Sequence, residues 1–202
     1  MEKLTQAQRT ALSDERMLDA AEALILELGT QATTLKGVGE RAGYSRGLAQ
    51  ARFGSKEVLF LRLTERSLEK WVNEVRQAAG NAKGLRALRS RVRAISAFTL
   101  NHPAAARVLY VLWFESVGFP SPMRDGLARF HDRGRRDIAE LVLEAKNMKE
   151  IGKSVDAELF ALQFTSAFFG ACYQWLVNAD AVDLASSAER MGKTLLMQLK
   201  SA

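Results

Sequence analysis

The sequence is poor in cysteine, proline and histidine: its 202 residues include one cysteine, Cys172, three prolines and two histidines. A single cysteine excludes a disulfide bond within the chain, which fits a reducing compartment. Residues 1–6 contain no apolar signal core, so secretion is not expected. Together these features predict a cytoplasmic protein.

Stretches that alternate apolar and polar residues are also scarce, and alanine and leucine are abundant. With 48% hydrophobic and 26% charged residues, the composition is typical of a globular protein, and the pattern predicts an all-α fold. The uncharged run Leu159–Val177 approaches the length of a membrane span, but polar residues interrupt it. We interpret it as a buried helix and expect no membrane partner; a membrane span is the alternative.

Residues that carry enzyme or metal chemistry are few. The sequence has no Gly-rich phosphate loop and no local nucleophile signature. His102 and His131 lack partners at helical spacing, and Cys172 stands alone, so no metal site is indicated. We therefore expect no catalytic residue, no metal and no cofactor, and an enzyme is kept only as the alternative.

Positive charge is in excess, with a formal net charge of +6, but it is unevenly distributed. Residues 1–60 carry eight basic and eight acidic side chains, so the surplus lies beyond residue 60. Within this neutral part, an acidic stretch precedes the segment Thr33–Lys56, which has five basic residues and one acid, Glu40. A short basic segment of this kind suits contact with nucleic-acid phosphates.

Capping residues and apolar spacing predict four helices in the first eighty residues. After a polar arm of residues 1–12, Ser13 or Asp14 is a candidate cap for a helix that ends at Gly29. Further helices are predicted over residues 35–42, 45–53 and 56–79, and then over 85–101, 104–116, 123–148, 155–178 and 184–201. We place a domain boundary inside the long fourth helix, which gives an amino-terminal domain of residues 13–60 and a carboxy-terminal domain of residues 61–202.

Residues 34–53 predict two short helices joined by a tight turn, the helix-turn-helix arrangement. Gly39 is small where the helices cross, and Gly43 supplies the positive φ that the turn requires. The residues expected to face outward from the second helix are Ser45, Arg46, Gly47, Gln50 and Arg52. Arginine pairs with guanine and glutamine with adenine in the major groove, so this set suits DNA recognition. The alternative is an ordinary bundle whose charged face is solvated.

A longer stretch of the sequence carries residues in a pattern that is known from one protein family. These residues are Met17–Ala21, Leu28-Gly29, Thr33–Leu35, Val38–Gly47 and Phe53–Leu59. Through these residues, positions 15–61 resemble the tetracycline-repressor (TetR) family of bacterial regulators. The resemblance implies a homodimeric transcriptional regulator that binds a palindromic double-stranded DNA operator and is released by a small-molecule effector. It also implies phosphate contacts by Thr34, Ser45 and Lys56. With the outward residues of the second helix, the expected DNA-binding residues are Thr34, Lys36, Ser45, Arg46, Gly47, Gln50, Arg52 and Lys56.

Two of these positions depart from the family's pattern, which has aromatic residues, or histidine, where this chain has Gln50 and Arg52. Gln50 can reach a base edge and Arg52 can take over the phosphate contact, and which of the two contacts a base stays open. The departure leaves the operator sequence open, and it keeps a ligand-binding or adaptor protein without DNA binding as an alternative. Lys3 and Arg9 in the polar arm either reach a minor groove or belong to a plain tail.

The resemblance further implies a ligand pocket in the middle helices, where aromatic residues have polar neighbours. An apolar cavity with a few polar groups suits a hydrophobic or aromatic effector, although such aromatics also form ordinary cores. The expected pocket residues are Phe98, His102, Tyr110, Trp113, Phe114, Phe130, Phe164 and Phe168. Arginine clusters over residues 86–93 and 129–136 are either solvated faces or attract DNA or an acidic effector.

The last two predicted helices are the expected dimer interface. The helix over residues 155–178 is apolar on more than one face, so a second face must be covered, either by another copy or by the protein's own core. The resemblance favours the copy. The expected interface residues are Phe160, Phe168, Ala171, Trp175, Met191 and Leu195.

Overall fold

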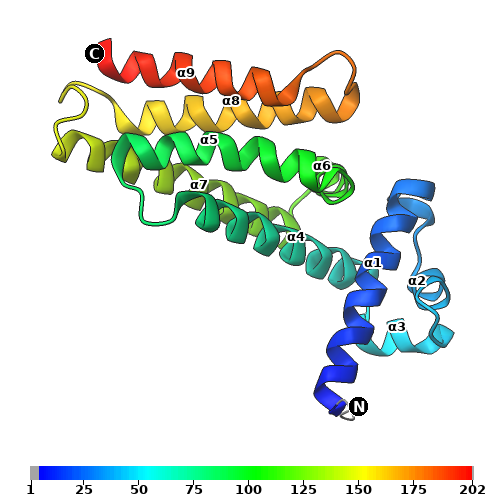
Figure 1. Ribbon diagram of the computed structural model, residues 1–202. Helices are drawn as coiled ribbons and strands as arrows, with labels where there is room; N and C mark the ends of the chain where they lie inside the picture. The colour runs from blue at the N-terminus through cyan, green and yellow to red at the C-terminus, as the bar shows by residue number, and fades with distance from the viewer. Residues whose placement is uncertain (1–4, 202) are drawn as a thin grey trace.

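The computed structural model describes residues 5–201, and this part of the chain is built of nine α-helices without a β-strand (Figure 1). The all-α fold expected from the sequence is confirmed. In chain order the helices are α1 (Gln6–Ala32), α2 (Leu35–Arg41), α3 (Arg46–Phe53), α4 (Lys56–Ala79), α5 (Gly84–Asn101), α6 (Pro103–Ser116), α7 (Pro122–Asn147), α8 (Ala157–Val177) and α9 (Leu184–Ser201).

Helices α2 to α9 begin and end within two residues of the predicted positions, but α1 starts much earlier than expected. The Thr5 hydroxyl accepts a hydrogen bond from the Gln8 backbone N–H at 3.2 Å, and the Gln8 side chain accepts one from the Thr5 N–H at 2.8 Å. This capping box begins the helix at Gln6. The expected arm is therefore wrong for residues 6–12, while Lys3 lies outside the described residues. Ser13 is buried inside the helix and is not its cap.

Helices α1, α2 and α3 pack around a shared core with the start of α4. Val38 of α2, Ala49 of α3 and Leu59 of α4 are all fully buried in it. A Cβ atom added to Gly39 would lie 3.0 Å from the Ser45 carbonyl oxygen, and Gly43 has a φ of 79°. Both glycine roles expected from the sequence are confirmed, because the helices cross closely and the turn uses left-handed backbone.

Helices α5, α7, α8 and α9 form a second core around Leu88, Val142, Phe164, Phe168 and Leu199. In Figure 1, α9 lies along α8 at one edge of these helices, and α4 lies at the opposite edge. The uncharged run Leu159–Val177 is almost all of α8. None of the helices within residues 5–201 combines the length and the apolar character needed to cross a bilayer.

Two helices join the cores. Helix α4 starts in the amino-terminal core with Leu59 and Leu63 and runs on beside α5. Helix α6 also packs against α1, and its Val108 and Leu112 are buried in the amino-terminal core. The helix-turn-helix is therefore attached to the rest of the molecule by packed side chains on two helices and not by a flexible linker.

A buried arginine fixes α4 against α1. The Arg66 side chain is 8% exposed, and its Nη1 donates to Asp19 at 2.7 Å and to Glu15 at 3.2 Å. Its Nη2 donates to Glu22 at 3.3 Å. The three carboxylates all belong to α1, so one guanidinium holds about two turns of α1 to α4.

Candidate functional site

The outer edge of α3 is exposed and polar. The Arg46 side chain is 73% exposed and forms an ion pair with Glu40 of α2. Gly47 and Gln50 are also exposed, and the Gln50 amide donates to the Gly54 carbonyl at 2.5 Å. Ser45 is the residue before the helix, and its hydroxyl makes no capping hydrogen bond. In Figure 1, α3 lies at the end of the molecule away from α5 to α9.

Arg52 does not share this edge. It is turned toward α1, where its Nη2 donates to the Thr10 hydroxyl at 3.1 Å and its Nε lies 3.5 Å from an Asp14 carboxylate oxygen. Arg52 is exposed, as expected, and its contact with DNA stays a prediction. Its partner Thr10 lies in the turns of α1 that precede the predicted start of the helix. Arg9 lies in the same turns.

The remaining expected DNA-binding residues lie around the two short helices. The Thr34 hydroxyl caps α2 by accepting from the Gly37 N–H at 3.1 Å, and Lys36 is exposed on the first turn of α2. Lys56, the first residue of α4, is half-buried and donates to the Gln31 carbonyl at 3.2 Å. Its ammonium also lies 5.7 Å from the centre of the Phe60 ring. Lys56 therefore links the end of α1 to the start of α4 in this structure.

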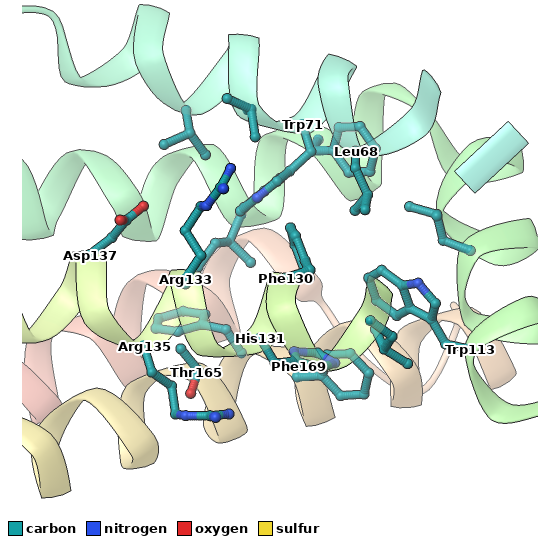
Figure 2. Close-up of a pocket in the computed structure, with 18 of the residues that line it drawn as sticks. Leu68, Trp71, Trp113, Phe130, His131, Arg133, Arg135, Asp137, Thr165 and Phe169 are labelled. Atoms are coloured by element: carbon teal, nitrogen blue, oxygen red, sulfur yellow. The ribbon is translucent and has the colours of Figure 1, made fainter. Parts of the chain in front are cut away.

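A large cavity of about 1670 Å³ lies among α4, α5, α6, α7 and α8. Figure 2 shows Leu68 and Trp71 entering it from α4, Trp113 from α6, and Phe169 from α8. The volume exceeds the roughly 300–1,000 Å³ of a typical small-molecule site. Aromatic rings and arginine side chains both line it, so the cavity suits a sizeable ligand with an apolar part and a polar part.

Six of the eight expected pocket residues line this cavity: Phe98, Tyr110, Trp113, Phe130, Phe164 and Phe168. The other two do not. His102 ends α5, and its Nε2 lies 2.6 Å from the Glu74 carboxylate. Phe114 is 52% exposed and packs against Tyr173, with ring centroids 5.2 Å apart. Phe114 follows Trp113 directly on α6, so the two rings leave the helix in different directions.

The cavity also contains residues that the sequence reading did not select: Leu68, Trp71, His131, Phe169 and Cys172. Leu68 and Trp71 belong to the long helix α4, whose amphipathic pattern indicates which residues face inward. The Tyr110 hydroxyl donates to the Phe169 carbonyl at 2.8 Å, and burial raises the pKa of Tyr110. Burial also raises the pKa of the Cys172 thiol, so both groups stay protonated at neutral pH.

The expected interface residues divide into two groups. Phe160, Phe168 and Ala171 are buried within the single chain, so their side chains are covered without a partner and that expectation is corrected. Trp175, Met191 and Leu195 are half-buried. The apolar side chains that α8 does expose are Leu159, Leu162, Tyr173 and Val177, which are 43–68% exposed. Their spacing puts them on one face of α8, with Ser166 and Gly170 between them.

Comparison with known proteins agrees with this arrangement. Residues 17–63 match the family model described as "Bacterial regulatory proteins, tetR family". This segment of the chain is a tetR-type DNA-binding domain. The matched residues span α1 from Met17, the helix-turn-helix and the start of α4. The search of curated proteins gave no match.

Solved structures of regulators share the fold along nearly the whole chain. A TetR-like transcriptional regulator from Rhodococcus sp. RHA1 is 18% identical, with 98% of each chain covered and a TM-score of 0.75. NalD, the secondary repressor of the MexAB-OprM multidrug efflux pump in Pseudomonas aeruginosa, is 19% identical, with 95% and 97% covered and a TM-score of 0.73. SmeT, in a complex with triclosan, is 18% identical, with 90% of each chain covered and a TM-score of 0.74.

Proposed function

We propose that this protein is a tetR-family transcriptional regulator, a homodimeric repressor that a hydrophobic or aromatic effector releases from a palindromic operator. The observation that carries the proposal is that α4 and α6 each contact both the amino-terminal core and the cavity. A ligand in the cavity therefore touches the helices that hold the helix-turn-helix. Two similar structures support repression and effector binding, since NalD is a repressor and SmeT was solved with triclosan bound.

Residues 13–60 act in this proposal as the DNA-binding domain, and residues 61–202 as the effector and dimerisation domain. Helix α3 enters the major groove with Arg46, Gly47 and Gln50, whose exposed edge has room for base contacts. The Ser45 hydroxyl and the amino-terminal backbone of α3 then meet a phosphate. Thr34, Lys36 and Lys56 flank this edge and supply further phosphate contacts, for which Lys56 exchanges its Gln31 partner.

Two copies of the chain are needed to read a palindrome, because each helix-turn-helix covers one half-site. The exposed apolar face of α8, with Leu159, Leu162, Tyr173 and Val177, is the surface that we assign to the second copy. Ser166 and Gly170 at its centre allow two helices to approach closely. Trp175, Met191 and Leu195 lie at the edges of this interface. In a dimer formed this way, the two α3 helices lie about one DNA turn, or roughly 34 Å, apart.

The release mechanism uses the two connecting helices. Trp71 and Leu68 of α4 and Trp113 of α6 meet the ligand, while Leu63 and Val108 of the same helices are packed against the amino-terminal core. The Thr30 hydroxyl donates to Glu115 at 2.5 Å, which ties the end of α1 to α6. A ligand that prefers a different position of α4 and α6 therefore changes the tilt of α3. DNA affinity then falls by the ratio of the ligand's affinities for the DNA-binding state and the released state.

An electrophoretic mobility-shift experiment tests the proposal. The full-length protein is titrated against duplexes from the region upstream of its own gene, with a scrambled duplex of equal composition as the control. We expect one duplex to bind at least about a thousandfold more tightly than the control, with two chains per site. Equal binding of every duplex would remove the regulator function, and one chain per site would remove the palindromic dimer.

A further inference from the structure

One end of the cavity is a box of flat aromatic rings. Trp113 and Phe169 stack nearly parallel, with ring centroids 5.6 Å apart and an interplanar angle of 17°. The ring centroids of Phe130 and Trp113 lie 5.7 Å apart, and those of His131 and Phe169 lie 5.5 Å apart. Figure 2 shows these rings together near α6. Planar rings attract other rings in offset or edge-on arrangements, so this end favours an aromatic ligand over a flexible aliphatic chain.

A buried hydrogen-bond donor in this box has no partner. Trp113 is 7% exposed, and within the described residues its Nε1–H makes no hydrogen bond. A buried indole N–H nearly always has an acceptor, and leaving it without one costs free energy. The indole nitrogen can only donate. The missing partner would be an acceptor atom, but neighbouring protein atoms cover the nitrogen, so a ligand in the cavity reaches it only if those atoms move.

The opposite end of the cavity carries an exposed arginine, Arg133, that has no protein partner within the described residues. In Figure 2, Arg133, Arg135 and Asp137 of α7 lie away from the Trp113 ring. Asp137 pairs with Arg91 at 3.1 Å, and Arg135 pairs with Asp132. Arg133 makes no ion pair or hydrogen bond with any residue that the structure describes, although it lines the cavity.

None of the other ionisable groups on the lining forms an ion pair with Arg133. Of the other acids, Glu65 lies 4.0 Å from Arg62 on its own helix, and Glu69 and Asp125 are exposed to solvent, as Arg133 itself is. Arg76 and Arg129 add positive charge to the same lining. His131 lies between the rings, and burial, together with the charge of Arg135, lowers its pKa. Its imidazole is therefore neutral at pH 7 and contributes no charge.

We propose that the effector is an aromatic carboxylate whose ring system lies against Trp113 and Phe169 and whose anionic group meets Arg133. This inference rests on the proposed function, in which the cavity receives the effector. The carboxylate takes two donors of the guanidinium. A cavity of about 1670 Å³ accommodates more than one fused ring, so the ligand class includes polycyclic acids.

The test compares three probes that share one ring system: 2-naphthoate, its neutral methyl ester, and the 2-naphthylmethylammonium cation. Binding to the full-length protein is measured by isothermal titration calorimetry at pH 7.5, a condition of the experiment. We expect the carboxylate to bind about tenfold or more tightly than the ester, and the cation to bind most weakly. Arg133→Gln should abolish the preference for the carboxylate while leaving ester binding unchanged.

Arg136→Gln is the matched control, because Arg136 is exposed on α7 and does not line the cavity. It should retain the full preference, and circular dichroism checks that both variants fold. Equal affinity for the acid and the ester, tighter binding of the cation, binding of none of the three probes, or an unchanged preference in Arg133→Gln would overturn the inference.

Operator release is measured separately with the same probes, so that the two proposals fail in different ways. If the carboxylate is preferred but the DNA complex persists, the ligand class stands and release by this class fails. If only the neutral or cationic probe releases the DNA, the regulatory function stands and the carboxylate inference fails.

Discussion

Replacing Arg66 by methionine tests whether one buried side chain holds the helix-turn-helix in place. Methionine keeps most of the apolar length of the side chain and removes its charge and donors. Of the three carboxylates that Arg66 contacts, Asp19 is 71% exposed, Glu15 is 58% exposed and Glu22 is 20% exposed. The two exposed carboxylates can return to water in the variant, so their contributions must be discounted.

The magnitude follows from these exposures. A charge-assisted hydrogen bond shielded from water contributes about 1.5–3 kcal/mol, which we assign to Glu22. An ion pair with an exposed partner contributes about 0–1 kcal/mol, which applies to Asp19 and Glu15. The Arg66 Nε is buried without a hydrogen-bond partner among the described residues, and removing it returns about 1–3 kcal/mol. Taking the middle of each range, we expect Arg66→Met to lower the free energy of unfolding by about 1 kcal/mol.

Urea denaturation followed by circular dichroism measures this change, and a matched variant lies one turn away on α4. Arg62 is 59% exposed, and its only ion pair within residues 5–201 is with Glu65 at 4.0 Å, so Arg62→Met should change stability by less than about 0.5 kcal/mol. We also expect Arg66→Met to weaken operator binding, because α1 is no longer fixed to α4. If the two variants have equal stability and equal DNA affinity, the reasoning about Arg66 is refuted.

Three further predictions concern DNA contact, dimerisation and packing. Arg46→Ala should weaken operator binding by about 1–3 kcal/mol in fluorescence anisotropy, whereas Arg136→Ala, which removes an equal charge from α7, should not; unchanged affinity would exclude Arg46 from the interface. Leu162→Glu should convert the dimer to a monomer in light scattering, whereas Leu143→Glu on α7 should leave it intact; a persistent dimer would show that α8 does not form the interface. Gly192→Ala should lower the free energy of unfolding by about 1–2 kcal/mol, because its Cβ would lie 2.7 Å from a Val92 methyl group; equal stability would contradict the packing of α9 on α5.

The helix boundaries could be predicted because their signals are local. Capping residues, glycines and prolines lie within a few residues of the ends that they determine, and Gly39 and Gly43 indicated the crossing and turn of α2 and α3. The start of α1 had the same kind of signal, since Thr5 and Gln8 have the spacing of a capping box. Without these turns the contact of Arg52 with Thr10 could not be foreseen, because Thr10 lies in them.

The inward and outward faces of the carboxy-terminal helices could not be predicted in the same way. Helix α8 is apolar all round, so periodicity does not distinguish buried Phe168 from exposed Leu162. On α6, Trp113 and Phe114 are adjacent aromatic residues, and only the packing of neighbouring helices places the first in the cavity. Arg66 depends on partners 44–51 residues away in the sequence, and no local pattern announces such a contact.

The central claim, that the exposed edge of α3 lies against DNA, is tested most directly by site-specific photocrosslinking. Gly47→Cys places a thiol on that edge, where an added Cβ atom has no neighbour within 4 Å. The native Cys172 is buried and its thiol pKa is raised, so an azidophenacyl reagent should label position 47 selectively. With the operator bound, we predict a crosslink from this position and none from Gly118→Cys, between α6 and α7. Operator DNA that is bound but crosslinks equally from both positions, or only from position 118, would contradict the account.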